Sequence, residues 1–147
     1  IKQMAQDTDW GNLDILIVDM PPGTGDAQIT VSQNLPLNGA IVISTPQSVA
    51  LNDAKKAIGM FEKVDVKILG IVENMSYFIL PDGSKEDIFG KDGGKNLAKE
   101  LEVNFIGSIP LDKEIRLNSD LGDPSKLEEK YFDEIVNSFL KNSKLKI

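Results

Sequence analysis

Four short apolar runs alternate with helical patterns along this chain of 147 residues, and each run is flanked by turn residues. The runs are rich in β-branched side chains, as strands buried on both faces usually are. They cover residues 14–19, 40–44, 67–73 and 104–109. Strands that alternate with helices form βαβ crossovers, which set the strands parallel in one sheet with helices on its faces. The pattern therefore predicts an α/β fold of three layers with a mainly parallel sheet, in one domain over residues 1–147.

The helical patterns place apolar residues at steps of three and four. One follows Ser48, which is a typical N-cap residue, and others begin after Asp26 and after Gly94. The last begins at about Ser125, and its polar face is acidic, so we expect it to pack onto the domain rather than onto anionic lipid. The acidic residues of that face are Glu128, Glu129, Asp133 and Glu134. The longest irregular stretch, residues 76–94, is interpreted as an insertion loop.

The chain contains no cysteine and no histidine. It therefore supplies no thiolate nucleophile, histidine base, disulfide or Cys/His zinc site. Its 16 basic and 23 acidic residues give a net charge of −7, and no basic cluster offers a footprint for a phosphate backbone, which argues against nucleic acid as a partner. No apolar run reaches the ~20 residues that span a bilayer. We expect a cytoplasmic protein with no membrane partner.

The most informative segment is residues 10–26, WGNLDILIVDMPPGTGD. Four aliphatic residues run into Asp19 at the end of the predicted strand, which is the Walker B arrangement, in which the carboxylate meets Mg²⁺ or its bound water. Gly23 follows four residues later, at the place where the amide of a switch-loop glycine approaches a γ-phosphate. The prolines and glycines around it stiffen the loop and let the backbone come close to a ligand. The alternative is that Asp19 caps a turn in a tight connection between strand and helix.

This whole segment resembles the signature of the Mrp/ApbC family of P-loop ATPases, in the deviant-Walker-A group that also includes nitrogenase iron protein, MinD and ParA. Further stretches are similar to that family's motifs in the same order. They are residues 44–51 (STPQSVAL), 70–78 (GIVENMSYF), 87–90 (DIFG) and 107–112 (GSIPLD). Such an ordered series is more specific than any single motif, and it fades beyond Asp120.

The resemblance implies a P-loop NTPase fold whose complete form binds ATP and Mg²⁺ at the carboxyl ends of the strands and hydrolyses the nucleotide slowly. Asp19 and Gly23 are then the catalytic residues, Asp19 holding Mg²⁺ through water and Gly23 sensing the γ-phosphate. Asn74, whose planar amide matches an adenine edge, reads the base. The wall of the base pocket is formed by Pro110, Leu111 and Asp112. From the residues alone, Asn74 also fits a turn former and Asp112 a cap of a short helix over residues 113–118.

The same resemblance implies a homodimer that delivers iron–sulfur clusters to apoprotein clients. Two family features are missing from the sequence. No Walker A phosphate loop is present, so we expect this chain to be the C-terminal part of a single P-loop ATPase domain and to be inactive alone. Many relatives carry Cys-x-x-Cys in the insertion, whereas Leu80 stands here at the first cysteine position, and cluster ligation needs thiolates. Two alternatives stay open: an ATP-gated partner-binding switch of the MinD/ParA kind without a cluster, and a non-catalytic interaction module.

Overall fold

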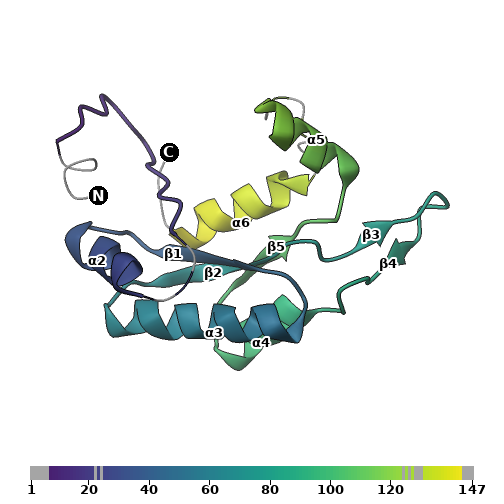
Figure 1. The fold of residues 1–147 in the computed structure, drawn as a ribbon, viewed down its shortest axis with the longest axis horizontal. Helices are drawn as coiled ribbons and strands as arrows, with labels where there is room; N and C mark the ends of the chain where they lie inside the picture. The colour runs from purple at the N-terminus through teal and green to yellow at the C-terminus, as the bar shows by residue number, and fades with distance from the viewer. Residues whose placement is uncertain are drawn as a thin grey trace.

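Three parallel strands form the central sheet of the protein, whose computed structural model is drawn in Figure 1. The structure describes residues 7–21, 23, 25–123, 125, 127 and 131–143. The strands are β1 (Ala40–Ser44), β2 (Ile68–Glu73) and β5 (Phe105–Ser108), paired in the order β1-β2-β5. Each matches a predicted apolar run to within one residue at either end. The predicted parallel sheet is confirmed.

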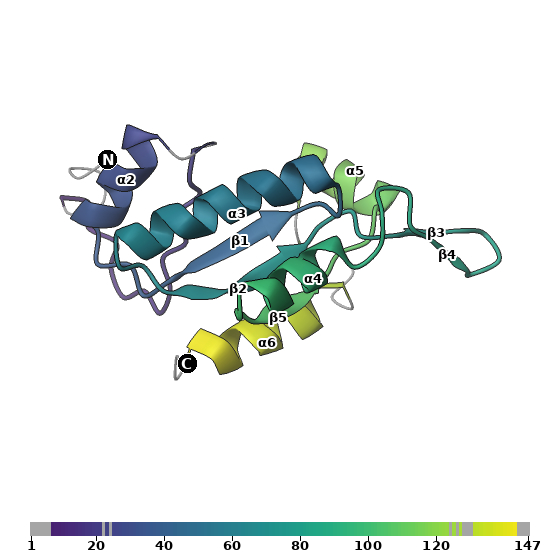
Figure 2. The ribbon, with the colours of Figure 1, turned by 90° about the horizontal axis from the view of Figure 1, so that it is seen from below.

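Helices cover both faces of this sheet. α3 (Ser48–Lys63) and α4 (Gly93–Glu100) pack on one face, and α6 (Asp133–Ser143) packs on the other against β5 and β2. Figures 1 and 2 show the three layers from two directions. Gly107 of β5 permits the close approach of α6, because a Cβ at this position would lie 2.8 Å from Ile135 Cγ1. The predicted three layers and the packing of the last helix onto the domain are confirmed.

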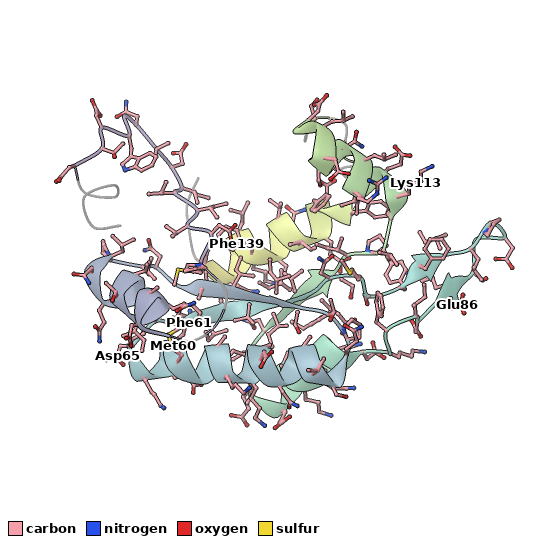
Figure 3. All side chains as sticks on the ribbon, in the orientation of Figure 1. Met60, Phe61, Asp65, Glu86, Lys113 and Phe139 are labelled. Carbon is pink, nitrogen blue, oxygen red and sulfur yellow. The ribbon has the colours of Figure 1, made fainter. Side chains whose placement is uncertain are left out.

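The main core lies between the sheet and the layer of α3 and α4. Its buried members are Val42, Ala54, Ile58, Ile71, Leu97 and Ala98. A second cluster holds α2 (Asp26–Asn34) near the end of α3; its buried members are Met60, Phe61 and Val66, and Figure 3 labels two of these side chains at that end of the molecule. Burial of each large aliphatic or aromatic side chain stabilises the fold by about 1.5–3 kcal/mol. Both clusters therefore anchor the elements that lead to the carboxyl edge of the sheet.

The predicted strand at residues 14–19 is wrong for the chain as described. No residue of this segment joins a sheet in the described part of the chain, and Leu16 and Ile17 are 46% and 86% exposed. A strand forms when a neighbour pairs its backbone groups and other elements cover its side chains, and the described residues give this segment neither. β1 likewise has one edge without a described partner, and its residue Ile43 is 64% exposed.

Several helix boundaries differ from expectation. Ser48 is the first residue of α3 rather than its N-cap; Gln47 takes the cap position without a side-chain cap bond, because its amide oxygen accepts a hydrogen bond from Thr45 Oγ1. The last helix begins at Asp133, and Glu128 and Glu129 lie outside the described residues. The short helix predicted over residues 113–118 is α5 (Lys113–Leu121). No helix in the described ranges is long and apolar enough to cross a lipid bilayer.

The predicted insertion contains a small antiparallel hairpin, β3 (Phe78–Ile79) and β4 (Lys85–Glu86). Its tip is closed by the Leu80 amide, which donates to the Ser84 carbonyl at 2.9 Å. The Lys85 ammonium lies 3.8 Å from the centre of the Tyr77 ring, which adds a cation–π contact at the base. The hairpin projects past the end of the central sheet in Figure 1, and Figure 3 labels Glu86 on it. The segment is thus an ordered arm beside the carboxyl ends of the strands.

Candidate functional site

The carboxyl ends of the three parallel strands meet at one edge of the sheet. Ser44, Glu73 and Ser108, the last residues of β1, β2 and β5, are in register across the two ladders. The loops that follow, at residues 45–47 and 109–112, therefore lie beside the loop that starts at residue 74. Open parallel sheets bind their ligands at this edge. It holds four predicted site residues, Asn74, Pro110, Leu111 and Asp112.

Asn74 leaves the end of β2 in a tight, well-held turn. Its amide donates to the Ser44 carbonyl at 2.7 Å, and its side-chain Oδ1 accepts from the Met75 amide at 2.9 Å. Met75 adopts a φ of +52°, which a non-glycine residue rarely does. The turn-forming interpretation of Asn74 is therefore part of the observed geometry. Among the described residues none accepts from Asn74 Nδ2, so this group is available to donate to a ligand.

The segment from Ile109 to Leu111 lies against the same loop. The Ser76 amide donates to the Ile109 carbonyl at 2.9 Å, and the Leu111 amide donates to the Tyr77 carbonyl at 2.8 Å. Pro110 between them is buried. These backbone bonds bring Pro110 and Leu111 to the loop of Asn74. Neither is among the described residues that line the cavity at Asn74, so their role as a pocket wall stays a prediction.

Asp112 caps α5 in the way that the alternative interpretation predicts. Its Oδ1 accepts from the Glu114 amide at 2.7 Å, and its Oδ2 accepts from the Tyr131 hydroxyl at 2.9 Å. An aspartate at an N-cap typically stabilises its helix by about 1 kcal/mol. Asp112 therefore holds α5 in place through both carboxylate oxygens, and its contact with a nucleotide stays a prediction.

An open cavity of about 610 Å³ lies between β1 and α3. Gly23 and Asn74 both line it, together with Ser44 and Thr45 at the end of β1. Residues from the predicted switch loop and from the predicted base-reading loop thus share one cavity. Asp19 is exposed and is not among the described residues that line this cavity.

A buried glutamine holds the loop that carries Gly23 through a hydrogen bond to its backbone. Gln28 of α2 is 4% exposed, and its Nε2 donates to the Pro21 carbonyl at 2.9 Å. Gly23 itself has a φ of +98°, a conformation that favours glycine. Pro22 and Thr24, which belong to the predicted signature, lie outside the described residues. Sequence reasoning missed Gln28, which is the one glutamine among the buried residues of α2.

Asp19 fits a magnesium site of the kind that depends on phosphates. The described residues contain no group of three acidic, histidine or cysteine side chains that could hold a metal ion. Mg²⁺ does not require one, because it keeps several waters and is usually bound by one or two carboxylates together with substrate phosphates. A single exposed carboxylate such as that of Asp19 is compatible with a Mg²⁺ ion that is also bound by nucleotide phosphates.

The hairpin offers no soft ligands for a cluster. Leu80 and Asp82 stand at its tip, where the Ser84 hydroxyl and amide donate to Asp82 Oδ1 at 2.6 and 2.9 Å. These two bonds, the hydroxyl first, hold the pKa of Asp82 below its ordinary value. Hard oxygen donors suit Mg²⁺ or Ca²⁺ rather than iron–sulfur clusters. With no cysteine in the 147 residues, thiolate ligands of a cluster cannot come from this chain.

A second buried polar residue escaped sequence reasoning. Glu73, the last residue of β2, is 1% exposed and receives hydrogen bonds from Ser76 Oγ and from the Gly94 amide. The signal was a carboxylate that ends an otherwise apolar strand, three residues before a serine. Its two partners explain how a charged group is accommodated there, since buried charges need hydrogen bonds to offset their desolvation.

Comparison with known proteins shows which family the chain belongs to. The chain matches the family model described as ParA, NUBPL iron-transfer P-loop NTPase, over residues 1–143. It is 50% identical over 125 residues to the iron–sulfur cluster transfer protein NUBPL of Dictyostelium discoideum, covering 84% of this chain and 39% of that protein. It is 51% identical over 130 residues to the iron–sulfur cluster carrier protein of Pyrococcus horikoshii, covering 88% of this chain and 44% of that protein. The chain thus spans less than half the length of these curated relatives.

Solved structures agree on the fold. A nucleotide-binding protein of Archaeoglobus fulgidus in complex with ADP superposes with a TM-score of 0.75 at 43% identity, over 84% of this chain and 51% of that one. The MinD cell division protein of Aquifex aeolicus superposes with a TM-score of 0.58 at 22% identity, over 87% of this chain and 52% of that one, which shows the shared fold alone. The chain belongs to the ParA family of P-loop NTPases, in its Mrp/ApbC branch of iron-transfer proteins.

Proposed function

We propose that this chain is the nucleotide-switch part of an ATP-dependent iron–sulfur cluster carrier. The observation that carries the proposal is the common cavity of Gly23 and Asn74 at the carboxyl edge of the sheet. An ADP-bound relative with the same fold at 43% identity supports a nucleotide as the ligand of that edge. Relatives named as cluster carrier or transfer proteins, at about 50% identity, support the cargo.

In this proposal each site residue has one task. Asn74 donates from its amide to the adenine, next to the wall of Pro110 and Leu111. Gly23 offers its backbone amide to the γ-phosphate, and Asp19 holds Mg²⁺ through water. When bound, Mg²⁺ supplies charge neutralisation for the β- and γ-phosphates. The phosphate loop comes from a part of the protein beyond these 147 residues, consistent with the share of the relatives that the chain spans.

The cargo step needs ligands that this chain does not provide. We propose that the complete protein acts as a homodimer that passes clusters to apoprotein clients, with thiolates supplied outside residues 1–147. The cytoplasmic location stays a prediction; a relative from Arabidopsis thaliana, 48% identical over 151 residues, is named as mitochondrial.

A second candidate is an ATP-gated switch that binds a partner and carries no cluster. The observation that favours it is the cysteine-free hairpin with Leu80 at its tip. Anaerobic reconstitution of the complete protein with iron and sulfide separates the two. A bound cluster that transfers to an apo-ferredoxin supports the carrier, whereas ATP hydrolysis without any retained cluster supports the switch.

The nucleotide part of the proposal is tested by Asp19→Asn in the complete protein. Loss of the carboxylate should lower Mg²⁺-dependent ATP hydrolysis about a hundredfold or more, equivalent to about 3 kcal/mol in the barrier. The fold should remain intact, because asparagine replaces the carboxylate with an uncharged amide of the same shape. Asp7→Asn, in the same exposed segment, is the matched control. Near-normal turnover of Asp19→Asn would remove the Walker B assignment.

A further inference from the structure

Glu73 is the one acidic side chain in the buried set of the described residues, and no nucleotide role uses it. It lies at the end of β2 with 1% of its surface exposed. One carboxylate oxygen accepts from Ser76 Oγ, and the other accepts from the Gly94 amide at 2.5 Å. An ionised carboxylate is costly to bury, and two donors offset that cost only while both stay in place. Glu73 therefore depends on the positions of Ser76 and Gly94.

These two donors stand at the two ends of the segment that contains the hairpin. Ser76 begins the stretch of residues 76–94, and Gly94 ends it in the first turn of α4. One buried carboxylate thus joins both ends of the arm that projects from the sheet in Figure 1. Phe78 continues the connection, since it forms a parallel bridge with Leu111.

The close approach of α4 to Glu73 is built into the sequence. A Cβ at Gly94 would lie 3.2 Å from both Glu73 Cβ and Glu73 Oε2, and a Cβ at Gly93 would lie 2.5 Å from the Pro46 carbonyl. A larger residue at Gly93 would push α4 away from Pro46, and one at Gly94 would require Glu73 to shift by a few tenths of an ångström. Gly94 thus permits the contact with Glu73, and Gly93 permits the contact with Pro46.

Glu73 is also the direct neighbour of Asn74. The Asn74 amide donates to the Ser44 carbonyl, and the Ser76 amide donates to the Ile109 carbonyl. Because backbone bonds hold both residues, the segment from residue 73 to residue 76 moves as one unit. A shift of Asn74 toward a ligand must be shared by Glu73 and Ser76. Packed segments of this kind transmit small displacements because they do not deform continuously.

We propose that Glu73 is a positioning residue that couples nucleotide binding at Asn74 to the hairpin arm of residues 76–94. This inference rests on the proposed function, because it takes the ligand of Asn74 to be an adenine nucleotide. Coupling free energies are reciprocal, so the state of the arm also changes the affinity for the nucleotide.

The test is hydrogen exchange of the complete protein with and without ADP. In the wild type, ADP should slow exchange of the Ser76 and Leu80 amides, which are bonded to Ile109 and Ser84, by about fivefold or more. In Glu73→Ala this slowing should be lost although ADP still binds, because Ser76 Oγ and the Gly94 amide no longer share an acceptor.

Two control variants separate coupling from stability. Glu73→Gln should retain the effect, because its amide oxygen can accept from Gly94 while its NH₂ group donates to Ser76 Oγ. Ile58→Ala, in the main core cluster and not among the hydrogen-bond partners of Glu73, should lower the melting temperature and yet keep the ADP response of the arm.

The outcomes distinguish the two proposals. ADP-dependent slowing that persists in Glu73→Ala, or that is lost equally in Glu73→Gln or Ile58→Ala, overturns the role of Glu73 and leaves the proposed function standing. A wild-type protein that binds neither ADP nor ATP overturns both.

Discussion

At the scale of single residues, Asn74 shows how a structural and a functional role combine in one side chain. Its Oδ1 closes the turn through Met75, while Nδ2 stays available to donate. Replacement by alanine should therefore remove a base contact without removing the backbone bond to Ser44. In the complete protein we expect Asn74→Ala to lower the preference for ADP over GDP about tenfold, as loss of one hydrogen bond of about 1.5 kcal/mol implies. Competition binding measures this ratio.

The control for that measurement is Asn96→Ala on the exposed side of α4. It should leave the nucleotide preference unchanged. An Asn74→Ala protein with wild-type preference would show that the base is read elsewhere, even if overall affinity falls.

Asp82 at the hairpin tip offers a residue-scale prediction that depends on pH. The Ser84 hydroxyl is the main reason that the pKa of Asp82 is lowered, and the Ser84 backbone amide adds to it. A lowered folded-state pKa contributes stability above the unfolded-state pKa, and this stability is lost as the pH falls through the folded-state pKa. Ser84→Ala should therefore raise the pKa of Asp82 toward its ordinary value and move that loss to higher pH. Carboxyl NMR titration measures the shift, and an unchanged pKa would exclude the hydroxyl as its cause.

Residue roles were predictable where the local pattern sets the geometry. Asp112 before a short helix is found as its N-cap, because the capping bond joins residues only two positions apart. Glu73 and Gln28 were not predictable in this way. Their partners are a helix start 21 residues away and a carbonyl seven residues away, and sequence alone does not state which distant groups will meet.

At the scale of elements, the sheet depends on Gly70, which lets β5 lie close to β2. A Cβ at Gly70 would lie 2.6 Å from Ile106 Cγ1 and 2.7 Å from the Asn104 carbonyl, and the φ of Gly70 is +158°. Backbone cannot yield as a flexible side chain can. Gly70→Ala should therefore lower the free energy of unfolding of the complete protein by about 3 kcal/mol, through overpacking and backbone strain. Denaturant titration provides the measurement.

Gly59 in α3 offers a control substitution that should change the free energy of unfolding in the opposite direction. A Cβ there meets nothing within 4 Å, so Gly59→Ala should stabilise by about 0.5–1 kcal/mol through helix propensity. If Gly70→Ala lowered the free energy of unfolding no more than Gly59→Ala does, the assigned packing of Gly70 would be wrong.

The elements that could be predicted are those whose partners lie in the described chain. The runs at residues 40–44, 67–73 and 104–109 pair with one another and form β1, β2 and β5. The run at residues 14–19 has the same composition, but a strand requires a neighbour, and pairing is a property of distant segments that composition does not report. Leu16, Ile17 and Val18 of this run are consequently exposed, Ile17 most of all.

At the scale of the whole molecule, the β1 edge of the sheet has no described strand partner, and the apolar segment of residues 14–19 is not covered by other described residues. β1 has a free edge in the described chain, Ile43 beside it is 64% exposed, and Ile17 is 86% exposed. Exposed strand edges with apolar neighbours invite pairing. In the complete protein we expect residues 14–19 to form a strand of the central sheet, with Asp19 at its carboxyl end on the nucleotide side.

Hydrogen exchange of the complete protein tests this arrangement directly. If the segment is a central strand, the amides of Ile15 and Ile17 should exchange as slowly as that of Ile71 in β2, which is fully buried, because both open only with large parts of the fold. The amide of Lys91, in an exposed bend, gives the fast reference in the same experiment. Exchange of Ile15 and Ile17 at the rate of Lys91 would mean that the segment is not a strand. Asp19 would then not be fixed at the edge of the sheet, and the magnesium role proposed for it would lose its structural basis.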